Sequence, residues 1–439
     1  MEKREFSRRR ERLLNMIGVG GIAIQPTAPE RVRNRDVFFP HRPDSDFFYL
    51  TGFPEPEAIA VFVPDRPQGE FLLFCRERDP EAETWHGRRA GLVGACELYG
   101  ADDAFPISDL DDILPGLLEN KERIYYTMGR YPEFDQRLVG WITRVNDKGR
   151  SGIHAPDQFV SLGHVLHESR LFKSRQEIKA MRRAASIAAD GHRRAMSACR
   201  PGMFEYQIEA ELLHTFMRQG ARSSAYPSIV GGGANSCILH YVENQDQLND
   251  GDLLLIDAGA EYDYYASDIT RTFPINGKFT DDQAAVYEVV LRAQFAAIEQ
   301  VRPGNTWNMP HEAAVEEITQ GLVGLGILKG RVSKLIRDDK YRPYYMHKTG
   351  HWLGMDVHDV GDYKIVDEWR TFEAGMVTTV EPGLYLSPTI GGLEKRWWNI
   401  GIRIEDDVLV TKTGHEVLSG DAPKQIDDIE SLMQEDRAA

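Results

Sequence analysis

Acidic residues inside apolar, strand-like runs constrain this chain more than any other feature of its sequence. "LLLIDAGAEYDYYASDITRTF" (residues 253–273) contains Asp257 and Asp268 within sequence that otherwise predicts β-strand. "VTTVEPGLY" places Glu381 at the end of an apolar run, and "GIRIEDDVLV" places Glu405 in another. A buried carboxylate without a partner costs several kcal/mol or takes up a proton. The fold must therefore bring these four acids to a compensating positive charge.

The first two acids fit a β-hairpin. If Asp257 and Asp268 lie opposite each other, the turn centre falls between Tyr262 and Asp263 and both acids share one face. Opposed side chains have Cβ atoms about 4.5–5.5 Å apart, and like charges that close are destabilising unless a cation lies between them. A metal ion would resolve the conflict. In the alternative interpretation, one acid caps a turn and the other pairs with Arg271.

Charge balance predicts more than one cation. Four carboxylates carry four negative charges, and two divalent ions would neutralise them. The stretch "HKTGHWLGMDVHD" (347–359) adds His347, His351 and His358 without the polar spacing of a surface helix. An oxygen-rich set with a single imidazole suits Mn²⁺, with Zn²⁺, Co²⁺ and Fe²⁺ as alternatives. We expect two divalent metal ions per chain, and the ligand types alone do not name the metal.

The 439 residues predict two or three domains. Residues 1–172 alternate apolar β-rich runs with polar or helix-like stretches, which favours an α/β domain. Ser174 with Glu177 forms a capping box that opens helix-rich sequence, so we place the boundary before it and expect a second domain at 173–439. After about residue 425 we expect a surface helix or a frayed end.

The order of elements in the second domain repeats. Helices are expected before paired strand blocks, and this order occurs twice, which predicts an α+β domain with an internal duplication. The expected helices are 174–198, 204–219, 281–301 and 310–326, and the expected strand blocks are 252–260, 264–273, 376–386 and 401–411.

Composition excludes several functions. The net charge is −16 and no basic run could neutralise a phosphate backbone, so nucleic acid is not an expected partner. The apolar stretch 16–24 is interpreted as a first strand rather than a signal peptide, and no segment has the length to span a membrane. The four cysteines are widely spaced without a C-x-x-C pair, which favours a reducing cytoplasm.

These motifs together resemble the dinuclear site of the pita-bread metallopeptidases and, within them, the aminopeptidase P family. "PHRPDSDFFYLTGFPEPEA" and "WHGRRAG" resemble the N-terminal domain of that family, so the likeness extends across the chain. The resemblance implies a pita-bread catalytic domain with a pseudo-two-fold duplication. It also implies that Asp257 binds one metal, that Asp268 and Glu405 bridge both, and that His351 and Glu381 complete the second.

The resemblance implies roles for further residues. His240 and His358 match substrate-side histidines, and His347 opens the histidine motif nearby. Taken alone, each would be interpreted as an ordinary hydrogen-bonded histidine. Arg403 and Tyr385 match positions beside the ligands, where a guanidinium holds carboxylates and a phenol adds a hydrogen bond; otherwise they predict a strand-face salt bridge and a core tyrosine.

Trp85 matches a tryptophan that reaches the substrate pocket of a neighbouring subunit, which implies a homo-oligomer, a dimer or a tetramer. Without the resemblance it would be a packing residue. Two features depart from the family pattern. The loop 361–375 differs in length and detail, which leaves Arg370 without a firm role as a substrate contact, and Lys348 is unusual within the histidine motif.

The implied reaction is hydrolysis of the N-terminal Xaa-Pro bond of peptides by a hydroxide held between two metal ions. Glu381 would shuttle the proton, His240 or His358 would assist at the carbonyl, and Asp257 would bind the substrate amine. The nearest alternative is prolidase, an Xaa-Pro dipeptidase, although the compact spacing of His351, Glu381 and Glu405 favours aminopeptidase P. A non-catalytic peptide-binding module is a further alternative.

Overall fold

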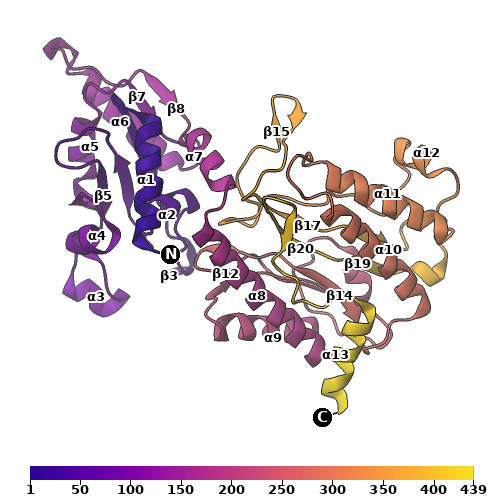
Figure 1. Cartoon of the computed structure of the whole chain (residues 1–439). Helices are drawn as coiled ribbons and strands as arrows, with labels where there is room; N and C mark the ends of the chain where they lie inside the picture. Colours follow the sequence, from indigo (N-terminus) through magenta and orange to yellow (C-terminus); the bar gives the residue numbers. More distant parts are fainter. Residues whose placement is uncertain (439) are drawn as a thin grey trace. The chain divides into compact units, whose positions relative to one another are not determined.

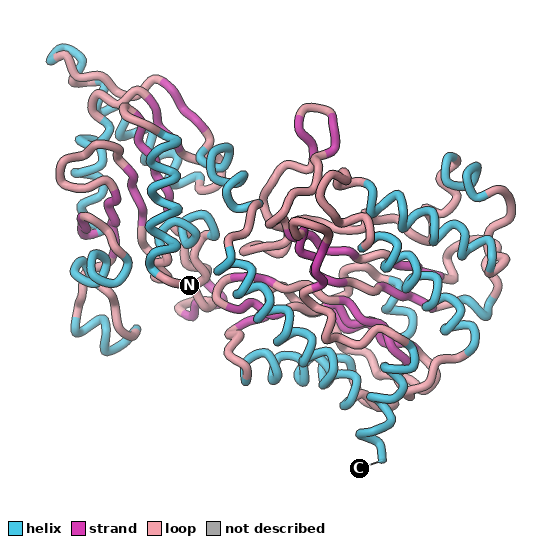
Figure 2. The backbone as a smooth tube through the Cα atoms, in the orientation of Figure 1, coloured by secondary structure: helices cyan, strands magenta, loops and turns pink. Residues whose placement is uncertain are grey.

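The computed structural model describes residues 1–438, with side chains as far as Glu435. It divides the chain into two compact units, unit 1 (Met1–Ser169) and unit 2 (Arg170–Ala439). In the described part of the chain, no helix is both long enough and apolar enough to cross a lipid bilayer. Figures 1 and 2 show the elements of both units.

Unit 1 is an α/β domain with one six-stranded mixed sheet in the order β6-β5-β4-β1-β7-β8. Strand β1 pairs antiparallel with β4 and parallel with β7. The apolar strand residues and the helices bury a core cluster that includes Val61, Phe74 and Trp141. The strands are β1 (Gly21–Pro26), β2 (Val32–Asn34), β3 (Val37–Phe38), β4 (Ile59–Phe62), β5 (Phe71–Cys75), β6 (Asp103–Pro106), β7 (Arg123–Tyr125) and β8 (Gln158–Val160). The helices are α1 (Lys3–Ile17), α2 (Ser45–Thr51), α3 (Pro80–His86), α4 (Gly91–Tyr99), α5 (Leu110–Leu118), α6 (Pro132–Asn146) and α7 (Leu162–Leu171).

The N-terminus corrects one prediction. Residues 16–24 were expected to form a first strand, but helix α1 extends to Ile17 and strand β1 begins at Gly21. Two basic residues of α1 are structural, because Arg9 donates to the Tyr49 carbonyl and Arg10 donates to the Leu50 carbonyl, each at 3.0 Å. These carbonyls lie in the last turn of α2, where a helix leaves acceptors unpaired.

Unit 2 has the pita-bread arrangement, with helices outside a central group of strands (Figures 1 and 2). Its two halves begin alike: Ser174 with Glu177 caps α8, and Thr280 with Gln283 caps α10, each as a complete capping box. The expected duplication is therefore present in the order of elements. The helices are α8 (Arg175–Ala198), α9 (Glu205–Arg218), α10 (Asp281–Ile298), α11 (Met309–Gly324), α12 (Val332–Arg337) and α13 (Ile426–Ala438).

Each of the four expected strand blocks of unit 2 is two shorter strands. Three candidate ligands lie in the breaks: Asp268 between β13 and β14, Glu381 between β17 and β18, and Glu405 between β19 and β20. Asp257 is the last residue of β11. The strands are β9 (Ser223–Ser224), β10 (Ile229–Gly232), β11 (Leu253–Asp257), β12 (Ala260–Tyr262), β13 (Tyr265–Ala266), β14 (Thr270–Pro274), β15 (Lys364–Ile365), β16 (Glu368–Trp369), β17 (Val377–Val380), β18 (Gly383–Leu386), β19 (Ile400–Arg403), β20 (Asp406–Val410) and β21 (His415–Val417).

The hairpin register differs from the prediction by one residue at its centre. Asp257 pairs with Thr270, not with Asp268. The turn is centred between Asp263 and Tyr264, which both have positive φ (51° and 66°), as a two-residue type I′ turn requires. Because Asp268 lies two positions before Thr270, it still faces the same side as Asp257. The two acids are diagonal neighbours rather than a directly opposed pair.

Candidate metal centre

The candidate ligands meet at one cavity of unit 2, with a volume of about 510 Å³. All five predicted metal ligands line it, as do three of the predicted histidines and Arg403. The lining comprises Tyr226, Pro227, Ile229, Leu239, His240, Val242, Asp257, Asp268, His347, Lys348, Gly350, His351, Val357, His358, Glu381, Arg403 and Glu405. Residues up to 179 positions apart in the sequence therefore share one site.

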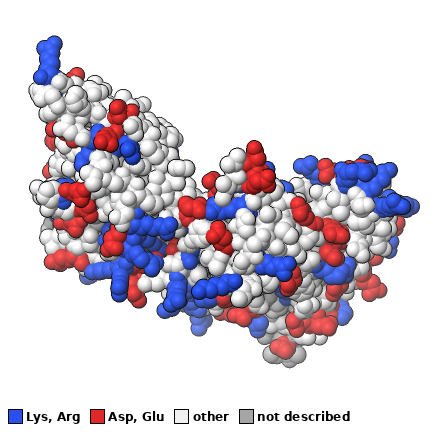
Figure 3. Space-filling view, turned by 45° about the horizontal axis from the view of Figure 1, so that its top comes forward, with Lys and Arg blue, Asp and Glu red and all other residues white. Residues whose placement is uncertain are grey.

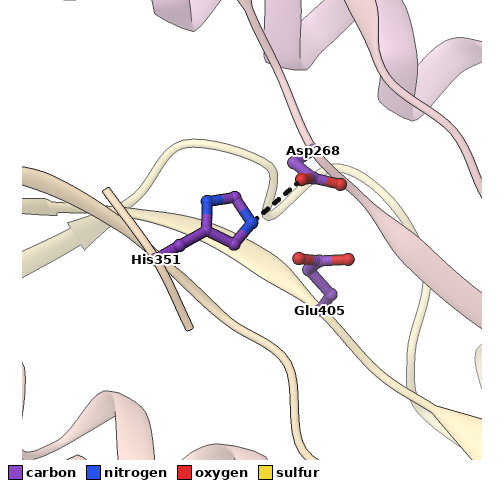
Figure 4. A group of neighbouring side chains, drawn as sticks. All are labelled: Asp268, His351 and Glu405. Atoms are coloured by element: carbon purple, nitrogen blue, oxygen red, sulfur yellow. Dashed lines mark ion pairs between the residues drawn. The ribbon is translucent and has the colours of Figure 1, made fainter. Parts of the chain in front are cut away.

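Three of the ligands are close enough to hold one ion. Asp268, His351 and Glu405 each offer a ligand atom, and these atoms all lie within 4.8 Å of one another (Figure 4). The His351 Nε2 atom lies 3.4 Å from Asp268 Oδ2 and 3.7 Å from Glu381 Oε1. The imidazole and the two carboxylates in Figure 4 come from three separate segments and point toward a common centre.

Burial and mutual repulsion raise the pKa values of three acids in the cavity. Burial, followed by repulsion from Asp257, raises the pKa of Asp268. Burial and three neighbouring carboxylates raise the pKa of Glu405 well above its ordinary value. Burial raises the pKa of Glu381 to about 7, although His351 and Arg403 oppose the shift. Carboxylates that repel one another in this way are stabilised by a divalent cation.

The tautomer of His351 leaves a nitrogen available to bind metal. Its Nδ1 lies 3.0 Å from the Trp352 carbonyl oxygen, which can only accept, so Nδ1 carries the hydrogen and Nε2 faces the acids with its lone pair. Burial alone would lower the pKa of His351, but Asp268 and Glu381 raise it to about 9. Without a cation the imidazole itself takes a proton to balance the acids. The donor set thus fits a divalent metal ion.

Arg403 organises the other side of the cluster. Its guanidinium donates to Asp257 Oδ2 at 2.6 Å, to Tyr385 Oη at 3.0 Å and to Thr270 Oγ1 at 3.1 Å. The Thr270 hydroxyl donates in turn to Glu405 Oε2 at 2.6 Å. All the groups around this guanidinium are buried or nearly so, which holds Asp257 and Glu405 in fixed orientations.

Tyr385 connects this group to the first predicted histidine. The Nδ1 atom of His347 lies 2.7 Å from the Lys348 carbonyl and therefore donates to it, so Nε2 accepts from the Tyr385 hydroxyl at 2.8 Å. Burial, followed by Arg403, lowers the pKa of His347 to about 4. His347 is therefore a neutral group on the cavity wall.

Tyr226 is a site residue that sequence reasoning did not identify. Its hydroxyl lies 2.6 Å from Asp257 Oδ1 and 2.5 Å from Asp268 Oδ1. Burial, followed by Asp257 and Asp268, raises the tyrosine pKa well above its ordinary value, so the phenol remains a donor. It precedes β10 in "SSAYPSIV", which contains no motif that would have indicated the contact.

The remaining predicted residues lie at different depths. His240 and His358 both line the cavity, and the His358 ring centroid lies 4.3 Å from that of His351. Trp85 belongs to α3 of unit 1 and is 78% exposed, which excludes a packing role within the described chain. Arg370 is buried with its guanidinium 5.7 Å from the Phe172 ring centroid, and it does not line the cavity.

Comparison with known proteins agrees with this geometry over both units. Residues 179–412 match the model of metallopeptidase family M24, and residues 6–125 match the aminopeptidase P N-terminal domain. The Xaa-Pro aminopeptidase of Escherichia coli K12 is 45% identical over 434 residues, covering 99% of this chain and 98% of the relative. The structure of Pseudomonas aeruginosa aminopeptidase PepP superimposes with a TM-score of 0.99 at 55% identity, covering 100% of this chain and 99% of the other.

A second similar structure is that of a complex with an inhibitor. Aminopeptidase P from E. coli with the inhibitor Pro-Leu is 44% identical to this chain, with a TM-score of 0.97 and full coverage of both chains. The similarity thus includes the N-terminal domain as well as the metal centre.

Proposed function

This chain belongs to metallopeptidase family M24. We propose that it hydrolyses the first peptide bond of peptides whose second residue is proline, and that this reaction takes place at the carboxylate cluster. The protein is an Xaa-Pro aminopeptidase, a metallo-exopeptidase. The observation that carries the assignment is the combination of the buried acid cluster with similarity to Xaa-Pro aminopeptidases along the whole chain.

We propose two divalent ions per chain, with Mn²⁺ favoured by the oxygen-rich donor set. Asp257, Asp268, His351, Glu381 and Glu405 would hold them. Bound divalent ions supply an acidified water and a Lewis acid for the scissile carbonyl. Four carboxylates near one guanidinium, with Asp268 and Glu405 buried, support more than a single cation, because Arg403 alone leaves most of the negative charge unbalanced.

The chain's own groups would move the proton and orient the substrate. Glu381 would take the proton that the attacking water loses and pass it to the proline nitrogen that leaves. His240 and His358 line the cavity and would donate to the carbonyl oxygen as it gains charge. His347, Tyr385 and Arg403 would position Asp257 beside the substrate amine.

Proline at the second position suits the cavity wall. A proline has no N–H to donate, so recognition must come from shape and apolar contact. The wall offers apolar side chains for this purpose: Pro227, Ile229, Leu239, Val242 and Val357. They support a pocket for a pyrrolidine ring close to the acids.

Unit 1 would serve oligomerisation, and in the proposed dimer or tetramer Trp85 would reach the substrate pocket of a neighbouring copy. The exposure of this indole supports a role in contact with another chain. The cytoplasm is the compartment we propose, because the four cysteines are free thiols.

The test offers Mn²⁺-loaded protein an Xaa-Pro-Xaa tripeptide and an Xaa-Pro dipeptide side by side. We expect cleavage of the tripeptide with release of the first residue. Cleavage of the dipeptide alone would identify a prolidase instead. Metal analysis after reconstitution tests the binding-module alternative, which predicts fewer than about one ion per chain.

A further inference from the structure

Lys348 is the basic residue of the cavity that the metal centre does not use. In the described part of the chain, only two Lys or Arg side chains line the cavity, Lys348 and Arg403. The Arg403 guanidinium is fully engaged by Asp257, Tyr385 and Thr270. Lys348 forms no described ion pair, and the one described hydrogen bond of its ammonium is a long contact of 3.5 Å with Asn308 Oδ1.

The surroundings of Lys348 are basic, although the chain as a whole is acidic. The segment 331–342, which contains α12, has five Lys or Arg and two Asp, and Figure 3 shows basic side chains gathered at this end of unit 2. Burial, followed by Arg342, lowers the pKa of Lys348, and Lys364 adds to the effect. One carboxylate, Glu312, opposes the shift. An anion placed beside Lys348 would therefore be stabilised by several cations together.

The contact with Trp369 does not explain why a lysine is present. The Lys348 Nζ atom lies 5.7 Å from the centroid of the Trp369 ring, near the limit of a cation–π contact. Lys364 approaches the same ring more closely, at 4.6 Å. Lys364 is thus the ammonium closer to this ring, and Lys348 is an exposed residue of the cavity wall.

The position of Lys348 identifies the part of the substrate that it would meet. An exopeptidase holds the free amine end in the closed part of its site, and the rest of the peptide leaves through the open side. Here Asp268 and Glu405 are buried and Lys348 is exposed. The α-carboxylate of a third residue lies roughly 7 Å beyond the scissile carbonyl, since an extended residue spans about 3.5 Å.

We propose that Lys348 is a specificity-determining residue that binds a carboxylate on the third residue of the substrate. This assignment rests on the aminopeptidase function proposed above. The carboxylate is the free α-carboxylate of a tripeptide or an acidic side chain at the third position of a longer peptide. The structure thus assigns a preference for anionic leaving fragments to an otherwise acidic enzyme.

The test measures kcat/KM for matched peptides with the Mn²⁺-loaded full chain. One pair is an Xaa-Pro-Ala tripeptide with a free or an amidated C-terminus, and the other is a pentapeptide amide with Glu or Gln at the third position. We expect the anionic member of at least one pair to be preferred by about three- to tenfold, through KM. The pair that shows the preference distinguishes the two sources of the carboxylate.

Variants separate recognition from structure. Lys348→Met should reduce the preference to about onefold and leave cleavage of the neutral peptides unchanged, and Lys348→Arg should retain it. Lys412→Met, which removes an exposed lysine of unit 2 that does not line the cavity, is the matched control and should behave as the wild type. A wild type without preference in both pairs overturns the assignment while the aminopeptidase function stands. An unchanged preference in Lys348→Met also overturns it. Absence of cleavage of every peptide contradicts the proposed function and this assignment together.

Discussion

Glu405 and Asp406 are adjacent in the chain and equally buried, at 1% and 0% exposure, yet the protein treats them in opposite ways. Burial and neighbouring acids raise the pKa of Glu405 well above its ordinary value. Burial would also raise the pKa of Asp406, but Arg271 and Lys424 outweigh it and lower the pKa to about 2. The two acids differ in the cations that surround them, not in their depth.

Asp406 lies in a complete polar network. Arg271 donates to its carboxylate at 2.8 Å, Lys424 at 2.6 Å and Gln294 at 2.7 Å. The alternative raised by the sequence, in which Arg271 pairs with Asp257 or Asp268, is therefore wrong. Successive strand residues point to opposite faces, and Arg271 belongs to the face of Asp406.

The difference in neighbouring cations separates acids with a structural role from acids that are candidates to bind metal. Around Asp406, the first residue of β20, the chain supplies the cations Arg271 and Lys424 and completes the network. On the other face, around a single guanidinium in the cavity, it gathers Asp257, Asp268, Glu381 and Glu405. A buried cluster left unbalanced is costly unless something outside the chain completes it, and metal ions would do so.

The strongest test of the comparison is Asp268→Asn. Loss of this carboxylate should reduce kcat/KM on the order of 10³-fold or more, because a direct ligand contributes more than the ten- to hundredfold of an outer partner. The metal-free protein should unfold at the same or higher denaturant concentration, since a repelling charge is gone. Retained activity would remove Asp268 from the ligand set.

Asp406→Asn should lower the stability of the protein without changing its metal binding, the opposite of Asp268→Asn. It leaves Arg271 buried without its counter-charge and should lower the free energy of unfolding by about 3–5 kcal/mol. Metal bound per folded molecule should remain unchanged. Denaturant unfolding and metal analysis on the same samples measure both, and a loss of metal without loss of stability would contradict the division between the two faces.

The pH dependence of metal-free protein should separate the two faces. The pKa of Glu381 rises from 4.5 to about 7 on folding, so its stabilisation is complete below pH 4.5 and is lost as pH rises through 7. The pKa of His351 rises from 6.5 to about 9, so its stabilisation is complete below pH 6.5 and is lost as pH rises through 9. Excess Mn²⁺ should abolish this alkaline loss.

Asp406 should contribute to a loss of stability at acid pH, as should the buried Asp359, whose pKa Lys173 and Arg170 lower against the effect of burial. The pKa of Asp406 is depressed from 3.8 to about 2, so its stabilisation is complete above pH 3.8 and is lost as pH falls through 2, with or without metal. Thermal unfolding from pH 2 to 9, with chelator and with Mn²⁺, measures both the acid and the alkaline loss. An alkaline loss that persists in excess Mn²⁺ would contradict the assignment of these groups to the metal centre.

Tyr226→Phe should have the smallest effect. Removal of the hydroxyl takes a donor from Asp257 and Asp268 and should weaken Mn²⁺ binding by about ten- to a hundredfold. The aromatic ring remains, so the free energy of unfolding should change little. Calorimetric titration of metal-free protein gives the affinity, and Tyr206→Phe, an exposed tyrosine on α9, is the control.

Sequence patterns predicted an α/β and an α+β domain and the four acids of the cluster, and the family resemblance added the pita-bread fold and the ligand role of His351. Capping boxes, helix spacing and repeated order predicted the duplicated architecture, because these signals are local along the chain. The register of the hairpin was missed by one residue, because Asp263 and Tyr264 adopt positive φ without a Gly or Asn to indicate it. Tyr226 was missed because its partners, Asp257 and Asp268, are distant in sequence. The N-terminal helix was missed although its apolar residues recur at helical spacing.

The sequence by itself determined that four acids and a histidine motif must meet in an apolar interior, since strand sequence buries what it contains. Only the tertiary structure decided which acid meets which cation. Glu405 immediately precedes β20 and Asp406 is its first residue, but whether Arg271 or the metal cavity lies beside each acid depends on long-range packing. Burial is encoded locally, whereas charge compensation is set by neighbours that the folded chain brings together.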